Sequence, residues 1–288
     1  MKKIFLFCAT VSAVTFISCL KEYSQENTGG PNDLIVGVDC RISKIAYTND
    51  TAAISGIGAI TAVINSLDIV TRVTKFDSLS NTIEFIANPL LANDTVYLSN
   101  VNTDEYFIRD INNRIDKLHG LSDPTDPLSP QFDVSYFYNT TGYLTSKIYS
   151  YTITPGTPFR VVVYTYTGNN LTHMTSTDLL TGDLEVDADI SYFNNIIPRR
   201  YLYLFPDEKA YSYFNQFYNF GERPRNAVRE ILVRNYDPGN TVRDSITSTF
   251  SDYIMSRDNY VLSVQMTGDD QPSIPASVGK LSFSYMCK

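Results

Sequence analysis

Short stretches of alternating apolar and polar residues dominate the chain from Arg41 onward, and this period of two predicts β-strands. The clearest stretches occupy residues 43–47, 81–86, 95–99, 157–166 and 183–190. Residues 52–73 fit strands or a helix by periodicity alone. Gly56, Gly58, Asn65 and a high content of β-branched residues favour strands there.

A looser unit recurs along the chain: an aromatic strand, a short polar turn with Gly or Asn, and a returning strand with spaced aliphatic residues. Its copies cover residues 106–118, 136–148, 164–174 and, with a weaker match, 253–264. Each copy predicts a β-hairpin. Because an isolated hairpin is only marginally stable, the copies are expected to stack into one sheet. The predicted fold class is therefore all-β and mainly antiparallel: a tyrosine-rich β-meander forming a twisted sheet, half-barrel or barrel-like.

One short helix is predicted near residues 208–219, with Pro206-Asp207 as the cap signal and Gly221 after its end. Its aromatic residues fall on one face; they are Tyr211, Phe214, Phe217 and Tyr218. Such a stripe can stack on a ligand, and Tyr211, Phe214 and Tyr218 are the candidate stacking residues. The favoured interpretation is a helix that plugs or covers the sheet, because buried aromatic stripes mostly pack.

The strand predicted at residues 183–190 carries an acid at every second position: Asp183, Glu185, Asp187 and Asp189. Period two would place all of them on one face. A calcium site is one interpretation, since hard cations take several carboxylates. A glycosidase acid pair is another, although it needs two carboxyls at a set separation around a cleft. The favoured interpretation is a solvated face paired with basic residues on neighbouring strands, such as Arg199, Arg200, Arg229 or Arg234.

The first 18 residues have the layout of an export signal. Lys2 and Lys3 precede an apolar stretch over residues 4–17, which is too short to span a bilayer, a task that takes roughly 20 residues. Phe16-Ile17-Ser18-Cys19 resembles the bacterial lipobox, with Phe16 where Leu is usual. The resemblance implies cleavage before Cys19 and acylation of its thiol. The alternatives are an ordinary signal peptide with an incidental cysteine, or an uncleaved short anchor. The predicted domains are the signal (1–18), the lipidated cysteine with a flexible tether (19–38) and a single β-rich domain (39–288).

The residues after the cysteine bear on the location of the protein. Lys21-Glu22 resembles the surface-export signal of Bacteroidetes lipoproteins. It implies a lipid-anchored outer-membrane protein, with the cell surface preferred to the periplasmic side. The membrane itself is thus the first expected partner, reached through the lipid anchor.

The net charge limits which other classes of partner are expected. The formal net charge is −8, and cleavage would remove Lys2 and Lys3 without removing an acid. Such a surface repels phosphate backbones, so nucleic acid is not expected as a partner.

Cys40 and Cys287 lie near the two ends of the predicted domain. Export to an oxidising compartment allows a disulfide between them, and two free or buried thiols are the alternative.

The layout as a whole resembles the Bacteroidetes lipoprotein families of unknown function of the DUF4595 type. Its features are the lipobox, a Cys-x-x-x-x-Ile start at Cys40, tyrosine-rich hairpins, a short helix and a closing sheet. The hairpin unit is also similar to the tyrosine-rich YD-type repeat of secreted bacterial proteins. These resemblances imply an antiparallel, barrel-like or half-barrel sheet, and they bring no known activity or catalytic residue.

Sequence motifs for catalysis are absent. The two histidines, His119 and His173, are expected at the surface or in turns, and no Gly-x-Ser-x-Gly elbow, phosphate loop or Cys-His metal spacing occurs. We therefore predict no catalytic residue and no cofactor. The first hypothesis is a non-enzymatic envelope lipoprotein that binds a glycan, a peptide or an envelope protein. The alternatives are a half-barrel that handles lipids or lipoproteins, and a glycan-active hydrolase.

Overall fold

The computed structural model describes residues 40–49, 56–66, 69–77, 82–98, 104–121, 129–154, 156–207, 212–271, 274 and 278–287. The predicted signal peptide, Cys19 and the tether lie outside these residues, so their predictions stay predictions. Throughout the described part, strands dominate and helix is confined to one turn, which confirms the all-β fold class.

The strands follow one another around a single sheet. They are β1 (Cys40–Asn49), β2 (Gly56–Ile64), β3 (Val70–Asp77), β4 (Thr82–Ala87), β5 (Leu90–Ala92), β6 (Thr95–Tyr97), β7 (Tyr106–Arg109), β8 (Ile115–Leu121), β9 (Gln131–Tyr138), β10 (Leu144–Tyr151), β11 (Pro158–Thr167), β12 (Asn170–Asp178), β13 (Leu184–Tyr192), β14 (Val228–Asp237), β15 (Thr241–Met255), β16 (Val261–Gly268) and β17 (Gly279–Cys287). The one helix, α1 (Ser212–Asn215), lies between β13 and β14 in the chain.

The hairpins predicted from the recurring unit are confirmed as β7–β8, β9–β10, β11–β12 and β15–β16. Their turns contain residues with positive φ: Asn113, Gly142, Asn169 and Asn259. Asn and Gly tolerate this conformation best, which is why these residue types mark the turns in the sequence. The stretch 52–73 contributes to β2 and β3, so strands and not a helix form there.

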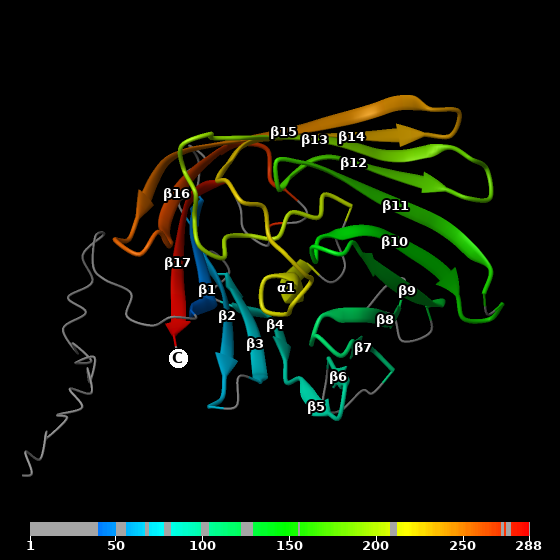
Figure 1. Ribbon diagram of the computed structural model, residues 1–288, viewed down its shortest axis with the longest axis horizontal. Coiled ribbons are helices and arrows are strands. Elements are labelled where there is room, and N and C mark those ends of the chain that lie inside the picture. Colours follow the sequence, from blue (N-terminus) through cyan, green and yellow to red (C-terminus); the bar gives the residue numbers. More distant parts are fainter. Residues whose placement is uncertain are drawn as a thin grey trace, which may run out of the picture.

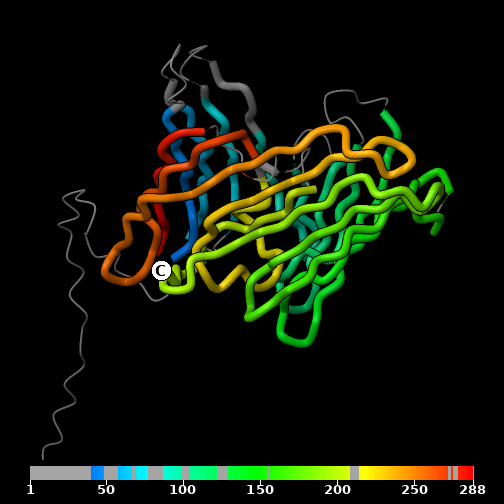
Figure 2. Tube along the Cα trace, turned by 90° about the horizontal axis from the view of Figure 1, so that it is seen from above, coloured from blue at the N-terminus to red at the C-terminus, as the bar shows by residue number. Residues whose placement is uncertain are grey.

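The sheet closes on itself because the first strand pairs with the last. β1 runs antiparallel between β17 and β2, and the remaining strands pair in chain order. Figure 1 shows the resulting ring, and Figure 2 shows blue β1 beside red β17. One seam remains at β4 and β5, where Asn88 and Pro89 separate the strands and the described residues show no strand register between them. Proline has no N–H to give to a ladder, which suits this position.

The wall of this nearly closed barrel has two chemically different faces. Cross-strand partners share a face, and one row around β11–β14 consists of Tyr164, Met174, Ala188 and Val233, all buried. The neighbouring row on the opposite face consists of Thr165, His173, Asp189, Leu232 and Thr247. The buried row belongs to the core, so the apolar face points inward and the polar face outward.

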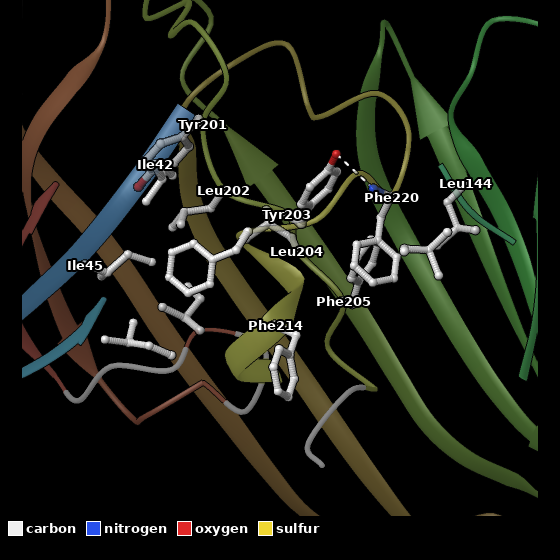
Figure 3. Close-up of a cluster of buried hydrophobic side chains, with 14 of the residues drawn as sticks. Ile42, Ile45, Leu144, Tyr201, Leu202, Tyr203, Leu204, Phe205, Phe214 and Phe220 are labelled. Carbon is white, nitrogen blue, oxygen red and sulfur yellow. Dashed lines mark hydrogen bonds between the residues drawn. The ribbon is translucent and has the colours of Figure 1, made fainter. Parts of the chain in front are cut away.

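A segment between β13 and β14, residues 193–227, leaves the wall and crosses the inside of the barrel (yellow in Figure 1). We call it the plug segment. Five consecutive residues of it, Tyr201 to Phe205, are buried, as are Phe214, Phe217 and Phe220. These side chains meet those of the wall; for example, the Phe107 ring lies 5.8 Å from Phe220 and Tyr164 lies 5.7 Å from Phe205. Figure 3 shows part of this packed cluster, in which aromatic and aliphatic side chains of the plug and the wall fill the interior.

The helix is shorter than predicted. Residues 208–211 lie outside the described part, and α1 ends at Asn215 instead of continuing to residue 219. The cause is the Gln216 side chain, which pairs with the backbone of Tyr203: its amide donates to the Tyr203 carbonyl, and its oxygen accepts from the Tyr203 N–H, both at 2.9 Å. This pairing diverts the chain after one turn. None of the helical residues described here forms a segment long and apolar enough to cross a membrane.

A disulfide joins Cys40 and Cys287, which are partners at the end of the β1–β17 ladder. It therefore secures the strand pair that closes the ring, across a sequence separation of 247 residues.

Replacing both cysteines by serine should lower the free energy of unfolding by about 2–5 kcal/mol, because the bridge restricts a very long loop in the unfolded chain. Urea titration followed by circular dichroism measures the change. Dithiothreitol should shift the midpoint of the native chain by a similar amount and leave the double variant unaffected. An unchanged midpoint of the native chain under reducing conditions would contradict the prediction.

Candidate ligand pocket at the barrel mouth

A cavity of about 870 Å³ lies at one mouth of the barrel. Strand ends and the turns of the β7–β8, β9–β10 and β11–β12 hairpins form its wall, and the plug segment adds residues between 197 and 203 and between 216 and 225. Asn112, Arg200 and Arg225 at its edge are exposed, so it opens to solvent. Cavities of this size hold small molecules. We call it the mouth pocket.

Backbone hydrogen bonds fix the plug segment to the hairpin turns around this pocket. The Ile115 N–H donates to the Asn219 carbonyl at 2.8 Å, and the Glu222 N–H donates to the Gly142 carbonyl at 2.9 Å. Within the plug segment itself, the Tyr203 hydroxyl accepts a hydrogen bond from the Phe220 N–H at 3.1 Å (Figure 3). These backbone hydrogen bonds thus hold the plug segment and the barrel wall together around the pocket.

The β7–β8 turn is held by Asp110. Its Oδ1 accepts hydrogen bonds from the N–H groups of Asn112 and Arg114, both at 2.8 Å, and its Oδ2 lies 2.7 Å from the Arg114 guanidinium. Burial alone would raise the pKa of Asp110, but these hydrogen bonds outweigh it and hold the pKa below its usual range. Arg114 also lies over the Tyr138 ring, 4.3 Å from its centroid. This part of the pocket wall is therefore pre-formed.

Gly221 is where the plug approaches the wall most closely. Its φ is +87°, and a Cβ there would lie 2.2 Å from the Gly142 carbonyl oxygen. We expect Gly221→Ala to lower the free energy of unfolding by about 2–4 kcal/mol, through backbone strain plus this clash. Gly182→Ala is the matched control, because Gly182 has φ +79° but open space around it. It should cost only about 1–2 kcal/mol. Equal urea midpoints for the two variants would show that the close approach does not exist.

The lining of the mouth pocket is strongly basic, in contrast to the acidic chain. Its cationic side chains are Arg41, Arg109, Arg200, Arg223 and Arg225, and Glu222 is its single acid among the described residues. Arg223 is engaged by the fold: it donates to the carbonyl oxygens of Arg200 at 3.0 Å and Gln216 at 3.1 Å, and to that of Tyr201. Arg109 donates from Nη2 to the Asn93 carbonyl at 3.0 Å.

Tyr218 lines the mouth pocket and its hydroxyl is buried, and we call this part of the pocket its inner end. Its ring is held against Phe107 and Phe214, with centroid distances of 5.6 and 6.3 Å. Burial raises the pKa of Tyr218 far above its usual value, and the charges of Arg41 and Arg109 only partly oppose this. The side chain is therefore a neutral hydroxyl within the electrostatic influence of two guanidinium groups.

Of the residues predicted for ligand stacking, the structure places only Tyr218 on the mouth pocket. Tyr211 lies outside the described residues. Phe214 lies in the core, 6.3 Å from Phe107 between ring centroids, with an exposed fraction of 4%. Sequence reasoning missed the pocket arginines, which come from separate strands and from the plug and share no spacing. Their concentration in an acidic chain becomes visible only in three dimensions.

The four acids predicted to share one face do not do so. The β12–β13 register slips between Ser176 and Thr177, and this bulge turns Glu185 inward. There it accepts hydrogen bonds from Ser176 at 2.8 Å and Arg160 at 2.9 Å. Asp183 precedes the strand, with its N–H bonded to Thr181. Only Asp187 and Asp189 remain together on the outer face.

These two carboxylates pair with basic groups on the neighbouring strands. Arg234 reaches Asp187 at 3.1 Å and Asp189 at 2.9 Å, and His173 Nδ1 lies 3.0 Å from Asp189. Burial alone would raise the pKa of Asp189, but the hydrogen bonds from His173 and Arg234 hold it below its usual range. One ligand atom from each of His173, Asp187 and Asp189 lies within 4.8 Å of the others. The bridging Arg234 already supplies the positive charge that a cation would bring.

A second polar cluster lies inside the barrel. Lys147 on β10 is 1% exposed, and its Nζ lies 3.1 Å from Asp207 Oδ2 in the plug segment. Asp207 also accepts hydrogen bonds from the hydroxyls of Tyr164 at 2.6 Å and Tyr149 at 3.4 Å. The ammonium group lies 4.8 Å from the centroid of the Phe205 ring. This ion pair ties the plug to the wall.

Comparisons with known proteins bear on the fold. The chain matches no protein-family model and no curated protein sequence. Its structure is similar to the crystal structure of a porin-like protein from Bacteroides uniformis, with a TM-score of 0.60, 12% sequence identity, and coverage of 85% of this chain and 98% of that one. It is also similar to a porin-like protein from Bacteroides vulgatus, with a TM-score of 0.50, 12% identity, and coverage of 86% and 99%. At this identity the likeness establishes a shared barrel-like fold.

Proposed function

We propose that this chain is a membrane-anchored envelope protein that binds a small polar ligand in the mouth pocket and does not catalyse a reaction. The observation that carries the proposal is the pocket itself: about 870 Å³, framed by fixed turns, and lined by arginines and amide side chains at the mouth of a filled barrel. Fixed polar groups around a cavity of this size favour binding of a small molecule.

The filled interior argues against a pore, although the similar Bacteroides structures are described as porin-like. In a porin the inside is polar and water-filled, and the outside is apolar toward lipid. Here the inward row around β11–β14 is apolar and meets the plug, and the outward row includes Thr165, His173 and Asp189. In this part of the wall the polarity is the reverse of that of a bilayer-spanning wall, which supports a domain held beside the membrane.

The same observations weigh against the two alternatives. A lipid-handling half-barrel requires an apolar concavity, but aromatic side chains of the plug segment occupy this one. A glycoside hydrolase requires two carboxyls around a cleft. Glu222 is the one carboxylate in the described lining of the mouth pocket. A glycan or a peptide remains the best class of ligand for a rim of amides and arginines.

Thermal-shift measurements with a panel of mono- and disaccharides and dipeptides test the pocket. At least one ligand should raise the melting temperature by several degrees at a concentration of about 100 Kd, which corresponds to about 2.7 kcal/mol. Ile197→Trp should abolish this shift, because Ile197 lines the pocket and is 48% exposed. Ile153→Trp is the control, because Ile153 is 82% exposed and is not among the residues that line the pocket. Shifts that survive Ile197→Trp, or a panel without any shift, would sink the proposal.

The membrane anchor rests on the sequence alone, namely the apolar stretch before Ser18-Cys19. Two or three acyl chains on one cysteine give a stable anchor, whereas one does not. Mass spectrometry of the mature N-terminus should find an acylated Cys19, and Cys19→Ser should release the protein from the membrane fraction. A native chain that retains Met1 would exclude this part of the proposal.

A further inference from the structure

The inner end of the mouth pocket contains polar groups whose hydrogen-bonding capacity the fold leaves unused. The Tyr218 hydroxyl is buried and has no hydrogen-bond partner in the described part of the chain. Packing of its ring on Phe107 and Phe214 prevents it from turning toward another acceptor. A buried hydroxyl without a partner is costly, and native proteins contain few of them.

Arg109 also has a buried hydrogen-bond donor that the fold leaves unused. Its Nη2 is bonded to the Asn93 carbonyl, and its backbone N–H donates to the Asp94 carbonyl at 2.9 Å, so the residue is held in place. Its Nε, however, is buried and has no hydrogen-bond partner among the described residues. Arg109 and Arg41 both act on the ionisation of Tyr218, which places the three side chains in one electrostatic neighbourhood. All three line the mouth pocket.

All three side chains can donate hydrogen bonds, and Arg41 and Arg109 also carry positive charge. An ammonium ligand would be repelled, and a neutral hydroxyl would gain nothing from the guanidinium charge. An oxyanion accepts several hydrogen bonds at once and neutralises guanidinium charge, often in a paired geometry. The chain as a whole carries −8, so the basic pocket is a local feature and not a result of composition.

We propose that the inner end of the mouth pocket binds an oxyanion group of the ligand, a carboxylate, phosphate ester or sulfate ester, with Tyr218 and Arg109 as donors and Arg41 as an additional positive charge. This inference rests on the proposed function, since it assigns a chemical class to the ligand of the same pocket. The amide and arginine rim then contacts the neutral, polar remainder of the ligand.

Isothermal titration of the purified full chain with glucose, glucuronate, glucose 6-phosphate and glucose 6-sulfate tests the inference and distinguishes the three oxyanions. At least one charged sugar should bind at least tenfold more tightly than glucose, and its affinity should fall as salt increases. Arg109→Gln should weaken that binding by about 10- to 100-fold and Tyr218→Phe by about 5- to 10-fold. Arg243→Gln is the control, because Arg243 is exposed and pairs with Asp244 away from the pocket, and it should change nothing.

Melting temperatures measured without ligand test whether the Tyr218 hydroxyl contributes to the stability of the fold. Tyr218→Phe should keep or raise the melting temperature. Tyr138→Phe, which loses a bond of 2.6 Å to the Ile115 carbonyl, should lower it by about 2–4 °C. Equal losses for both variants would overturn the inference, as would charged sugars that bind no more tightly than glucose. If neutral sugars bind in a manner sensitive to Ile197→Trp but charge gives no advantage, the proposed function survives and only the oxyanion site fails.

Discussion

Raising the pH through about 11 should unfold this protein in one cooperative transition that coincides with ionisation of its buried tyrosines. Burial raises the pKa of seven of them far above the ordinary value near 10; they are Tyr138, Tyr166, Tyr192, Tyr201, Tyr218, Tyr253 and Tyr285. In the unfolded chain the same side chains ionise near pH 10. Their stabilising effect is therefore complete below about pH 10 and is lost as the pH rises from there toward the folded-state pKa.

The expected effect is large because the contributions add. At pH 11 each such tyrosine favours the unfolded state by about 1.4 kcal/mol, so the group together contributes about 10 kcal/mol, comparable to the whole stability of a typical domain. Since the chain has no Trp, absorbance at 295 nm reports tyrosinate alone. Its sharp rise should coincide with the loss of the far-ultraviolet circular dichroism signal.

A single variant tests the mechanism. Tyr218→Phe removes one buried phenol and no hydrogen bond among the described residues, so it should reduce the loss at pH 11 by about 1.4 kcal/mol. The variant should also unfold at a slightly higher pH than the native chain. A gradual rise of absorbance centred near pH 10, with circular dichroism unchanged, would show that the tyrosines are accessible to solvent in the folded state.

The hairpins could be predicted from the sequence because their signals are local. A turn such as the one at Asn113 or Gly142 needs a residue that tolerates positive φ, and the flanking strands alternate over a few positions. Ring closure depends on β1 meeting β17, a contact between the two ends of the domain. The cysteines at the two ends were the only signal for that contact, and they left the pairing open.

The plug segment and the bulge in β13 were beyond local reasoning for different reasons. Tyr201 to Phe205 is a continuous apolar run, which is typical of a segment buried on all sides, but no pattern states which cavity will receive it. In β13 the alternation of acids is regular, and the structure departs from it at Glu185 because Arg160 and Ser176 offer partners on the inner face. At this position, the hydrogen bonds made in the folded protein outweigh the alternating pattern of the sequence.

Removal of the buried Lys147 charge should have the largest effect of any single substitution considered for this barrel. Asp207 would remain in the interior, with an exposed side-chain fraction of 4% and without its cation. Breaking a buried ion pair on one side costs about 3–5 kcal/mol, because the remaining charge is neither solvated nor paired. We therefore expect Lys147→Met to lower the free energy of unfolding by this amount in urea titrations.

The double variant Lys147→Met with Asp207→Asn should recover most of this loss. Asparagine is uncharged and still offers an oxygen to the Tyr164 hydroxyl, and replacing a buried pair as a whole is often nearly neutral. The exposed pair Arg243–Asp244, with both side chains about half exposed, is the control, and Arg243→Met should leave the urea midpoint within error. If Lys147→Met lowered stability no more than Arg243→Met, water would have to reach the Asp207 carboxylate in the folded protein. The barrel interior would then be less tightly filled than its packing indicates. The stability of the plug and the accessibility of the barrel interior are thus measured by the same substitution.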